Sequence, residues 1–211
     1  ADDVRRVLNG PLAAICWTDP PWNVAYGSSD HPSYRKRTIA NDDLGAEFPA
    51  FCAEFCASIK VATKPGAALY MAMSAQEWPV IDAALRAAGF HWSATIIWAK
   101  DTLVLGRGDY HRQYEPLWYG WNEDAPRLHP VEDRKQSDLW FIDRPKRSDL
   151  HPTTKPTALV TRALLNSSVP GEKVFEPFSG SGSTLIACEE TGRACRAIEL
   201  EPKYVQVAIE R

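Results

Sequence analysis

The sequence predicts an α/β fold, with a mostly parallel β-sheet and helices on both of its faces. Short apolar runs typical of buried strands alternate with longer segments whose apolar residues recur at helical spacing. This alternation is typical of parallel strands joined by crossover helices. The length of 211 residues, with 45% hydrophobic and 24% charged residues, suits one compact domain. We therefore expect residues 1–211 to form a single domain without internal repeats.

The N-terminal third predicts a helix, a buried strand and a second helix. The segment "DDVRRVLNG" has acidic residues at its start, arginines further along and Gly10 at its end, as a short helix does. It begins without methionine and without a preceding strand, which is compatible with a fragment of a longer protein. "LAAIC" predicts a strand that the prolines of "DPPW" end, because proline fixes φ and lacks an N–H. The polar stretch 28–43 predicts a mobile loop, and the helix after it is expected to end at Pro65 and Gly66.

The remaining strands and helices follow in the same alternating order. "AALYMAMS" predicts a strand, "AQEWPVIDAALRAAG" a helix and "FHWSATIIWAK" a further strand. "YEPLWYGW" predicts a strand that pairs with the preceding one as an antiparallel edge hairpin. Residues 122–150 are rich in proline and charge, so we expect a short irregular insert there. "TALVTRALLNSSVPG" predicts a helix, and residues 172–211 predict strand, glycine loop, helix, strand and helix.

The composition excludes several classes of protein. No apolar run approaches the roughly 20 residues needed to cross a bilayer, and the first residues lack the apolar stretch of a signal peptide. A net charge of −3 excludes unspecific coating of nucleic acid. The five cysteines form no C-x-x-C pair and have no histidine cluster beside them, so we expect buried free thiols and no metal site. We predict a cytoplasmic protein without a membrane partner.

Positive charge and aromatic residues are nevertheless concentrated locally. Several of the eight tryptophans lie between Trp92 and Trp140, where they either pack in the core or stack on bases. Two basic clusters either contact phosphate groups or form solvated faces. The first consists of Arg35, Lys36 and Arg37, and the second of Arg134, Lys135, Arg144, Lys146 and Arg147.

A glycine loop and a later carboxylate indicate a bound nucleoside. Gly180 and Gly182 stand between a strand and a helix, where the backbone can approach a ligand closely. The third glycine of a dinucleotide loop would fall at Leu185, and the lysine of a phosphate loop is also missing. Glu199 follows about 20 residues later at a strand end, where it either binds the ribose hydroxyls or faces solvent. These features favour a nucleoside-containing cofactor other than NAD.

Several motifs stand in a particular order along the chain: "DPPW", then "HPTTKP", "FEPFSGSGST" and "AIELEPKY". Together they resemble the β group of S-adenosylmethionine-dependent DNA amino-methyltransferases, the adenine-N6 and cytosine-N4 DNA methylases, over nearly the whole chain. The resemblance implies a Rossmann-like methyltransferase fold, which is a three-layer α/β/α sandwich with seven strands. It also implies that the cofactor is S-adenosyl-L-methionine and that the substrate is double-stranded DNA, as in restriction–modification.

The same resemblance implies where the cofactor lies. In this family "FSGSG" lies under the methionine part of the cofactor, Glu199 is placed on the ribose, and the lysine of "HPTTKP", Lys155, lies beside the cofactor. A solvated lysine at a helix start is the alternative for Lys155. The cofactor-binding residues implied are Asp19, His151, Thr153, Lys155, Phe178, Ser179, Gly180, Ser181, Gly182, Ser183, Thr184, Glu199 and Leu200.

The chemistry of amino-group methylation explains the "DPPW" motif. The lone pair of an exocyclic amino group is delocalised into its ring, so two acceptors for its hydrogens are needed to aim the nitrogen. Asp19 and the carbonyl of Pro20 suit this role, and the two prolines keep them still. The base must be flipped out of a duplex to reach them. Trp22 then either stacks on the base or packs in the core. The expected catalytic residues are Asp19, Pro20, Pro21 and Trp22.

Target recognition is expected in the insert 122–150 and in the loop "GRGDYHRQYEP". Polar residues of that loop either approach the flipped base or are ordinary surface residues. The predicted substrate-binding residues are Trp22, Tyr26, Arg35, Lys36, Arg37, His111, Arg112 and Glu115. A homodimer is one option for the oligomeric state, which the sequence leaves open.

The first residue of "DPPW" favours adenine N6 as the methyl acceptor. Family members with Asp there more often act on adenine, whereas Ser leans towards cytosine, so cytosine N4 is the first alternative. An adenine-N6 methyltransferase of RNA, a non-catalytic DNA-binding subunit and an NAD-dependent dehydrogenase are further alternatives. The motif order, the joint presence of "DPPW" and "FSGSG", and the missing third glycine argue against these three respectively.

Overall fold

A computed structural model of the protein describes residues 2–25, 39–105, 109–144 and 154–211. The helices are α1 (Asp2–Leu8), α2 (Phe48–Ala62), α3 (Trp78–Ala87), α4 (Thr157–Ser167), α5 (Ser183–Thr191) and α6 (Pro202–Glu210), and Gly45–Glu47 form a 3₁₀ turn. The strands are β1 (Ala13–Thr18), β2 (Thr63–Ala72), β3 (Phe90–Val104), β4 (Arg112–Asn122), β5 (Leu139–Phe141), β6 (Lys173–Glu176) and β7 (Ala194–Ala197).

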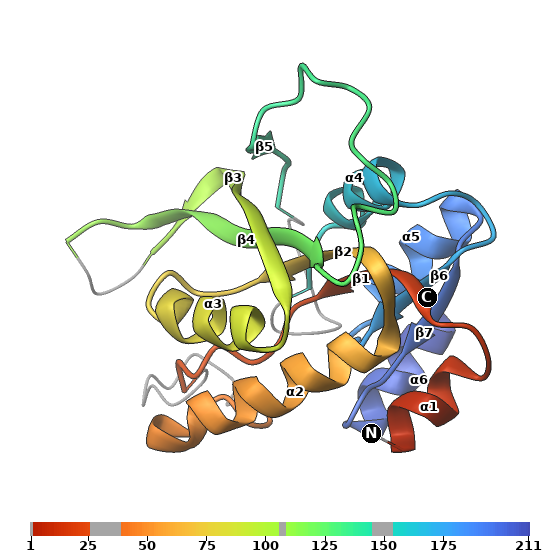
Figure 1. Ribbon diagram of the computed structural model, residues 1–211. Helices are drawn as coiled ribbons and strands as arrows, with labels where there is room; N and C mark the ends of the chain where they lie inside the picture. The colour runs from red at the N-terminus through yellow and green to blue at the C-terminus, as the bar shows by residue number, and fades with distance from the viewer. Residues whose placement is uncertain (1, 26–38, 106–108, 145–153) are drawn as a thin grey trace.

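The strands form one seven-stranded sheet in the order β5-β3-β4-β2-β1-β6-β7 (Figure 1). β1 lies inside the sheet and pairs in parallel with both β2 and β6, and β7 continues the parallel part. β4 is antiparallel to its neighbours β2 and β3. The predicted mostly parallel sheet with an antiparallel hairpin is therefore confirmed, and the carboxyl ends of the parallel strands meet at one edge of the sheet.

Helices cover both faces of the sheet and create two cores. On one face, α1, α2 and α3 pack against a cluster that includes Cys16 of β1 and Phe175 of β6. On the other face, α4 and α5 pack against a cluster that includes Trp17 and Val174. Neighbouring residues of β1 thus point into opposite cores, and all six residues of the strand are buried. This double burial explains why the strand is a continuous apolar run rather than an alternating one.

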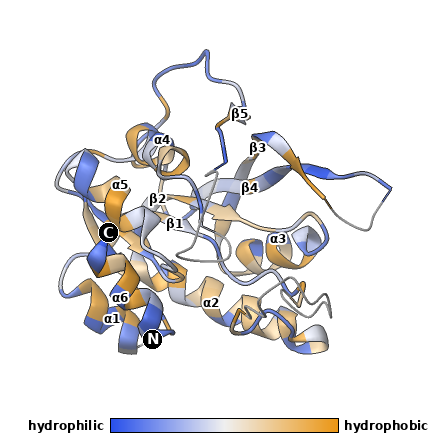
Figure 2. Ribbon diagram, turned by 180° about the vertical axis from the view of Figure 1, so that it is seen from behind, coloured by the Kyte–Doolittle hydropathy of each residue, from blue (hydrophilic) through white to orange (hydrophobic). Residues whose placement is uncertain are grey.

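The segment between β4 and β5 rises away from these layers and is mostly hydrophilic (Figures 1 and 2). It belongs to the predicted irregular insert, but the sequence analysis missed β5, which pairs in parallel with β3 over three residues. β5 is therefore the edge strand on that side, and the antiparallel hairpin lies one position further in. The short length of β5 explains why no periodic pattern predicted it.

Two element boundaries also differ from the prediction. Helix α2 ends at Ala62, before Pro65 and Gly66, because Thr63 is already extended and begins β2. Gly66 instead has a φ of +76° in β2, and its carbonyl accepts the N–H of Leu128 at 2.8 Å. Strand β7 ends at Ala197, so Glu199 lies two residues beyond it. Pro65 and Gly66 therefore do not end a helix. They form an irregular part of β2, to which the insert is hydrogen-bonded.

All five cysteines are free thiols, of which Cys16, Cys52, Cys56 and Cys188 are buried and Cys195 is half-buried. Burial raises the pKa of the Cys52 thiol to about 12. Within the described parts of the chain, no group of three or more residues of the metal-binding types is assembled. Of the described helices, none combines the length and the apolar character that a membrane span requires.

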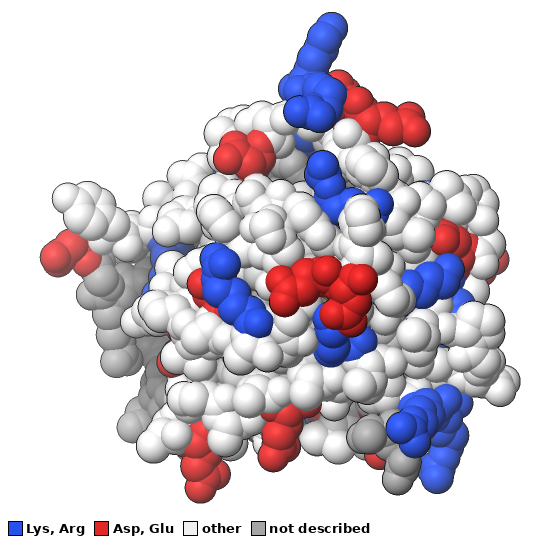
Figure 3. All heavy atoms as spheres, in the orientation of Figure 1, with Lys and Arg blue, Asp and Glu red and all other residues white. Residues whose placement is uncertain are grey.

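Charges of both signs are interspersed on the face of the molecule shown in Figure 3. Arg134 and Lys135 of the second predicted basic cluster are exposed in the segment before β5, and Arg144 is exposed after it. Lys146 and Arg147 lie outside the described residues. Contact with an extended polyanion would thus depend on local groups rather than on this whole face.

Candidate active site

The "DPPW" turn begins directly after β1, at the carboxyl edge of the sheet. Pro20 is buried, and Pro21 and Trp22 are half-buried. The Asp19 side chain is 18% exposed, so its carboxylate lies mostly in a dry environment. In open parallel sheets, ligands bind outside the carboxyl ends of the strands where the strand order reverses, and here it reverses at β1, between β2 and β6. The turn therefore lies where the fold places its binding sites.

Residues outside the motif fix the shape of this turn. The buried Asp42 carboxylate accepts the N–H of Trp22 at 2.8 Å. Asn23 has a φ of +56°, which asparagine tolerates better than most residues. Its side-chain oxygen accepts the N–H groups of Leu44 and Gly45, and its amide donates to Glu77 at 3.1 Å. The turn is thus bound to the segment that leads into α2 and to the start of α3.

Asp19 is the first member of a buried chain of alternating charges. Lys155 Nζ lies 2.6 Å from Asp19 Oδ2 and 3.1 Å from Glu115 Oε2. Lys100 Nζ lies 2.6 Å from the other oxygen of Glu115. The side chains of Lys155, Lys100 and Glu115 are 8%, 7% and 14% exposed. Two carboxylates and two ammonium groups therefore balance in a mostly buried site.

This environment shifts the pKa values of the chain members in different directions. Burial raises the pKa of Asp19; Lys155 opposes this, and Glu115 adds to it. Burial would also raise the pKa of Glu115, but the lysines on both sides outweigh it and lower that pKa. Burial alone would lower the pKa of Lys155, and its two carboxylate partners raise it instead. Lys155 and Glu115 stay charged, and Asp19 is the member whose proton binding is most easily changed.

Trp22 lies under the same lysine. Lys155 Nζ is 4.8 Å from the centre of the indole ring, a distance at which a cation and an aromatic face attract each other. The ring also packs against the core beneath α2 and α3. Its N–H is buried and finds no hydrogen-bond partner of normal geometry among the described residues. Both predicted roles of Trp22, packing and presentation of a face at the site, are compatible with this position.

The glycine loop between β6 and α5 is stabilised by backbone hydrogen bonds. Gly180 donates its N–H to Glu199 Oε2 at 2.7 Å, and Ser179 donates to the carbonyl of Ile198 at 2.9 Å. Gly182 has a φ of +83°, and a Cβ at this position would lie 2.8 Å from the Cβ of Ala208 in α6. The loop can take this shape only with glycine at position 182.

Several polar side chains of the loop point into the protein. Thr184 donates to Glu176 Oε2 at 3.0 Å, and Phe178 donates its N–H to Glu176 Oε1 at 3.0 Å. Burial raises the pKa of Glu176 well above its usual range, while these hydrogen bonds oppose the shift. Ser183 donates its hydroxyl to the carbonyl of Lys155 at 2.8 Å. This last bond joins the glycine loop to the charged chain at Asp19, so the two predicted parts of the site form one structure.

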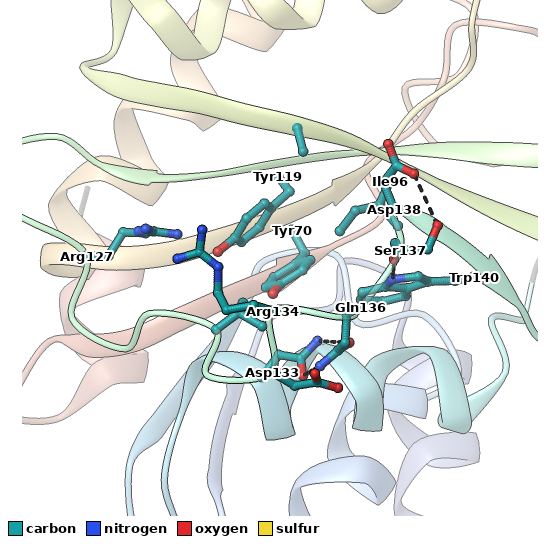
Figure 4. A pocket seen from close by; sticks show the side chains of 13 residues that line it. Tyr70, Ile96, Tyr119, Arg127, Asp133, Arg134, Gln136, Ser137, Asp138 and Trp140 are labelled. Atoms are coloured by element: carbon teal, nitrogen blue, oxygen red, sulfur yellow. Dashed lines mark hydrogen bonds between the residues drawn. The ribbon is translucent and has the colours of Figure 1, made fainter.

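Two of the cavities in the described structure bear on the site prediction. One of about 300 Å³ is lined by Ser179 and Glu199 of the predicted cofactor site, together with residues of α1, β7, α5 and α6. The other, of about 270 Å³, lies beneath the insert, with Tyr70, Tyr119 and Trp140 at its base and Arg127 and Arg134 beside them (Figure 4). Its lining includes Arg134 of the second basic cluster but no residue predicted to be catalytic or cofactor-binding. The first cavity borders the loop that could hold a cofactor.

The structure brings together many of the predicted site residues. Asp19, Pro20, Pro21, Trp22, Lys155 and Glu115 surround the strand end, and Phe178, Ser179, Gly180, Ser181, Gly182, Ser183, Thr184 and Glu199 form or border the glycine loop. Leu200 follows Glu199 and is 70% exposed. His111 and Arg112 are exposed at the start of β4, where Arg112 donates to Gln76 at 3.0 Å. Tyr26, Arg35, Lys36, Arg37, His151 and Thr153 lie outside the described residues.

Lys100, Asp42 and Glu176 are site residues that the sequence analysis missed. A charged residue within or at the end of an apolar strand is costly to bury without a partner. Lys100 in "IIWAK" and Glu176 in "KVFEPF" carry this signal. Asp42 stands in a polar stretch that resembles any surface loop, so no local signal distinguishes it.

The sequence and the fold are similar to those of known DNA methylases. The N6_N4_Mtase family, described as DNA methylase, matches residues 13–210. The Type II methyltransferase M.SmaI of Serratia marcescens is 31% identical over 141 residues, which are 61% of this chain and 48% of that protein. The chain spans about half the length of the curated relatives it matches.

Solved structures share the fold over almost the whole chain. The M1.HpyAVI–SAM complex aligns with a TM-score of 0.73 and 20% identity, covering 99% of this chain and 96% of that one. PvuII DNA methyltransferase, described as cytosine-N4-specific, aligns with a TM-score of 0.75 and 16% identity, covering 99% and 83%. At these identities the similarity establishes the fold.

Proposed function

The chain belongs to the N6_N4_Mtase family of DNA methylases, and from this premise we propose that it transfers a methyl group from S-adenosyl-L-methionine to the N6 amino group of adenine in DNA. The observation that supports this most is the bond between Ser183 and the carbonyl of Lys155. It joins a glycine loop suited to a nucleoside cofactor to a lysine that contacts Asp19 of "DPPW".

The residues of the glycine loop fit this cofactor better than a dinucleotide. The loop has a carboxylate, Glu199, at the cavity that Ser179 borders, and a carboxylate suits two ribose hydroxyls. Both oxygens of Glu199 already accept a backbone N–H, from Gly180 and Glu201, and each retains a further lone pair. The loop sequence "FSGSGST" has no lysine or arginine to neutralise a pyrophosphate. When bound, S-adenosylmethionine supplies an activated methyl group on a sulfonium.

The turn supplies the groups that prepare the amino nitrogen. Asp19 and the carbonyl of Pro20 accept its two hydrogens and draw the lone pair out of conjugation with the ring. The nitrogen loses one proton as it gains the methyl group, and Asp19, with its raised pKa, is able to accept that proton. Trp22 stacks on the flipped base, which offsets part of the few kcal/mol lost when the base leaves the duplex.

Substitution of Asp19 tests the proposed activity. Asp19→Ala is expected to abolish incorporation of tritiated methyl groups into unmethylated DNA and to weaken cofactor binding slightly at most. A thermal melting curve measured in parallel checks that the variant is folded. Turnover near the wild-type value in a folded variant would refute the assignment of Asp19.

A second candidate function is methylation of cytosine N4. It is favoured by the fold shared with the cytosine-N4-specific PvuII enzyme, whereas the Asp of "DPPW" favours adenine. Enzymatic digestion of the methylated DNA followed by mass spectrometry of its nucleosides distinguishes the two. N6-methyladenine supports the first function, and N4-methylcytosine supports the second.

The polymer and the cofactor can be tested separately from the base. Label is expected in duplex DNA and not in single-stranded RNA of the same sequence. S-adenosylmethionine is expected to raise the melting temperature, because a ligand that binds only the folded state stabilises it. Stabilisation by NAD alone would support the dehydrogenase alternative instead.

Contacts to the DNA backbone are proposed for the insert. Arg134 and Lys135 are exposed there, so neither side chain is part of the hydrophobic core. Their replacement by alanine is expected to weaken binding of all DNA sequences similarly and to reduce the salt dependence of binding.

A further inference from the structure

One oxygen of the carboxylate that the proposed reaction needs as acceptor is already occupied by a lysine. Asp19 Oδ2 lies 2.6 Å from Lys155 Nζ, the distance of a short charged hydrogen bond. The other oxygen, Oδ1, has no hydrogen-bond partner of normal geometry among the described residues, although the indole N–H of Trp22 is close enough to the carboxylate to lower its pKa. A base amino group that approaches Asp19 must therefore compete with the Lys155 ammonium for the charge of the carboxylate.

Glu115 offers that ammonium a second partner. Its Oε2 lies 3.1 Å from Lys155 Nζ, which is 0.5 Å further than the Asp19 oxygen. Both carboxylates are poorly exposed, at 18% for Asp19 and 14% for Glu115, so neither is screened by bulk water. The ammonium lies between the two carboxylates, and Glu115 Oε2 is buried without a hydrogen-bond partner of normal geometry in the described part of the chain. A small movement of the ammonium can therefore exchange its short contact with Asp19 for a hydrogen bond to Glu115.

Lys100 fixes Glu115 in the position that makes this possible. Lys100 Nζ lies 2.6 Å from Glu115 Oε1, on the side of the carboxylate opposite to Lys155. It is also 4.9 Å from the centre of the Trp98 ring, which provides a cation site along β3. Since the pair is neutral, Glu115 can remain charged in a buried place without drawing Lys155 away completely.

We propose that Glu115 and Lys100 are positioning residues for methyl transfer, which let the Lys155 ammonium move from Asp19 towards Glu115 when the amino group of the base enters. The inference rests on the proposed function, because it assigns the purpose of the movement to that reaction. Neither residue touches the reacting atoms in this scheme. Both act through Lys155, and Lys155 acts on Asp19.

Kinetics of full-length variants test the effect on the reaction. In Glu115→Gln, Asp19 is the one carboxylate of the buried charge network that remains for Lys155. We therefore expect kcat to fall at least tenfold, while KM for DNA and KM for S-adenosylmethionine each change less than about threefold. Lys100→Arg keeps the charge and is expected to retain kcat within about threefold. A matched control is Lys60→Met, which removes a 3.0 Å ion pair with Asp124 and hydrogen bonds to Gly89 and Asn122 at the other end of β3 and β4. This variant is expected to leave kcat unchanged.

Titration of Asp19 by carbon NMR, with ¹³C in the aspartate side chains, provides a readout that does not need activity. Lys155, Glu115 and the indole of Trp22 face Asp19, and the charge of Glu176 lies close enough to interact with it. Glu115→Gln is expected to lower the pKa of Asp19, because Lys155 then has no competing carboxylate. Lys100→Met is expected to raise it, because Glu115 then draws Lys155 more strongly. Lys60→Met is expected to leave it unchanged.

The two measurements separate the inference from the function on which it rests. If folded Glu115→Gln retained kcat within twofold, or if neither variant moved the Asp19 pKa, the positioning roles would be refuted. If Glu115→Gln did not fold, the opposite pKa shift in Lys100→Met would decide between the same outcomes. If the wild-type protein methylated neither DNA nor RNA, the proposed function would fail, and with it the purpose of the lysine movement. The titration would still show whether Lys155 is shared between Asp19 and Glu115.

Discussion

The carboxylate of Asp42 accepts the backbone N–H of Trp22 at 2.8 Å, although the two residues are 20 positions apart. Asp42 is only 3% exposed, and its backbone carbonyl accepts the N–H of Ala25 at 2.7 Å. It therefore binds the turn after β1 at two points. The rigidity of "DPPW" thus depends on a residue outside the motif as well as on its two prolines.

Replacement of Asp42 is expected to loosen this turn. Asp42→Ala leaves the partly buried N–H of Trp22 without its acceptor, which costs about 1–3 kcal/mol in the free energy of unfolding. Because the position of Asp19 then varies, kcat is expected to fall about tenfold or more. Urea unfolding and methyl transfer rates measure the two effects. The neighbouring exposed Asp43→Ala is the control, and equal behaviour of the two variants would contradict the role of Asp42.

A side chain at position 182 is expected to destabilise the protein. Gly182→Ala combines a φ of +83° with a Cβ only 2.8 Å from that of Ala208, so both strain and overpacking apply. Gly171→Ala isolates the strain, because Gly171 has a φ of +84° and nothing within 4 Å of the added Cβ. We expect a loss of about 1 kcal/mol for Gly171→Ala and about 2–4 kcal/mol for Gly182→Ala. Similar losses in urea unfolding would show that packing against α6 is not important.

Glu199 is expected to contribute to binding of the methyl donor. Glu199→Gln keeps a carbonyl oxygen for the N–H of Gly180 but loses the charge that favours ribose hydroxyls. We expect the Kd for S-adenosylmethionine to rise about tenfold, which is about 1.4 kcal/mol, with little change in the Kd for DNA. Isothermal titration calorimetry measures the first and fluorescence anisotropy the second. Glu201→Gln, whose carboxylate is 44% exposed, is the control.

The fold was predictable because the central strands β1 and β2 are strongly apolar and helices α2 and α3 carry apolar residues at helical spacing. β1 is the plainest case, with six buried residues between two layers of helices. The prediction missed β5, which has only three residues, and misplaced the end of α2 at Pro65 and Gly66. These two residues interrupt β2 where Leu128 of the insert crosses it, and such a long-range contact leaves no trace in the local sequence.

The candidate site was predictable where its residues stand in motifs. Asp19, Lys155 and Gly182 each belong to such a segment, and the structure places them near one another through the sheet edge and the Ser183 bond. The sequence analysis expected Glu115 either near the base or on the surface, and no signal indicated that two lysines enclose it. Lys100 could have been suspected from its apolar strand, but its partner lies on the neighbouring strand. Sequence patterns identify reactive groups more easily than the side chains that position them.

The raised pKa of Asp19 predicts how the reaction depends on pH. The base amino group needs the ionised carboxylate as acceptor, so kcat/KM is expected to fall as the pH is lowered through the pKa of Asp19 in the free enzyme. Burial, the largest cause, raises this pKa, and Glu115 adds to it although Lys155 opposes it. The acid limb should therefore lie above the pH at which an ordinary aspartate titrates.

The variant Glu115→Gln removes one influence that raises the pKa of Asp19, so its acid limb should move to lower pH. The exposed Asp43→Asn should leave the acid limb in place. Initial rates on duplex DNA over a series of buffers of constant ionic strength measure the shift. An acid limb at the ordinary aspartate value, or one that Glu115→Gln moves upward, would contradict the buried, shared charge of Asp19.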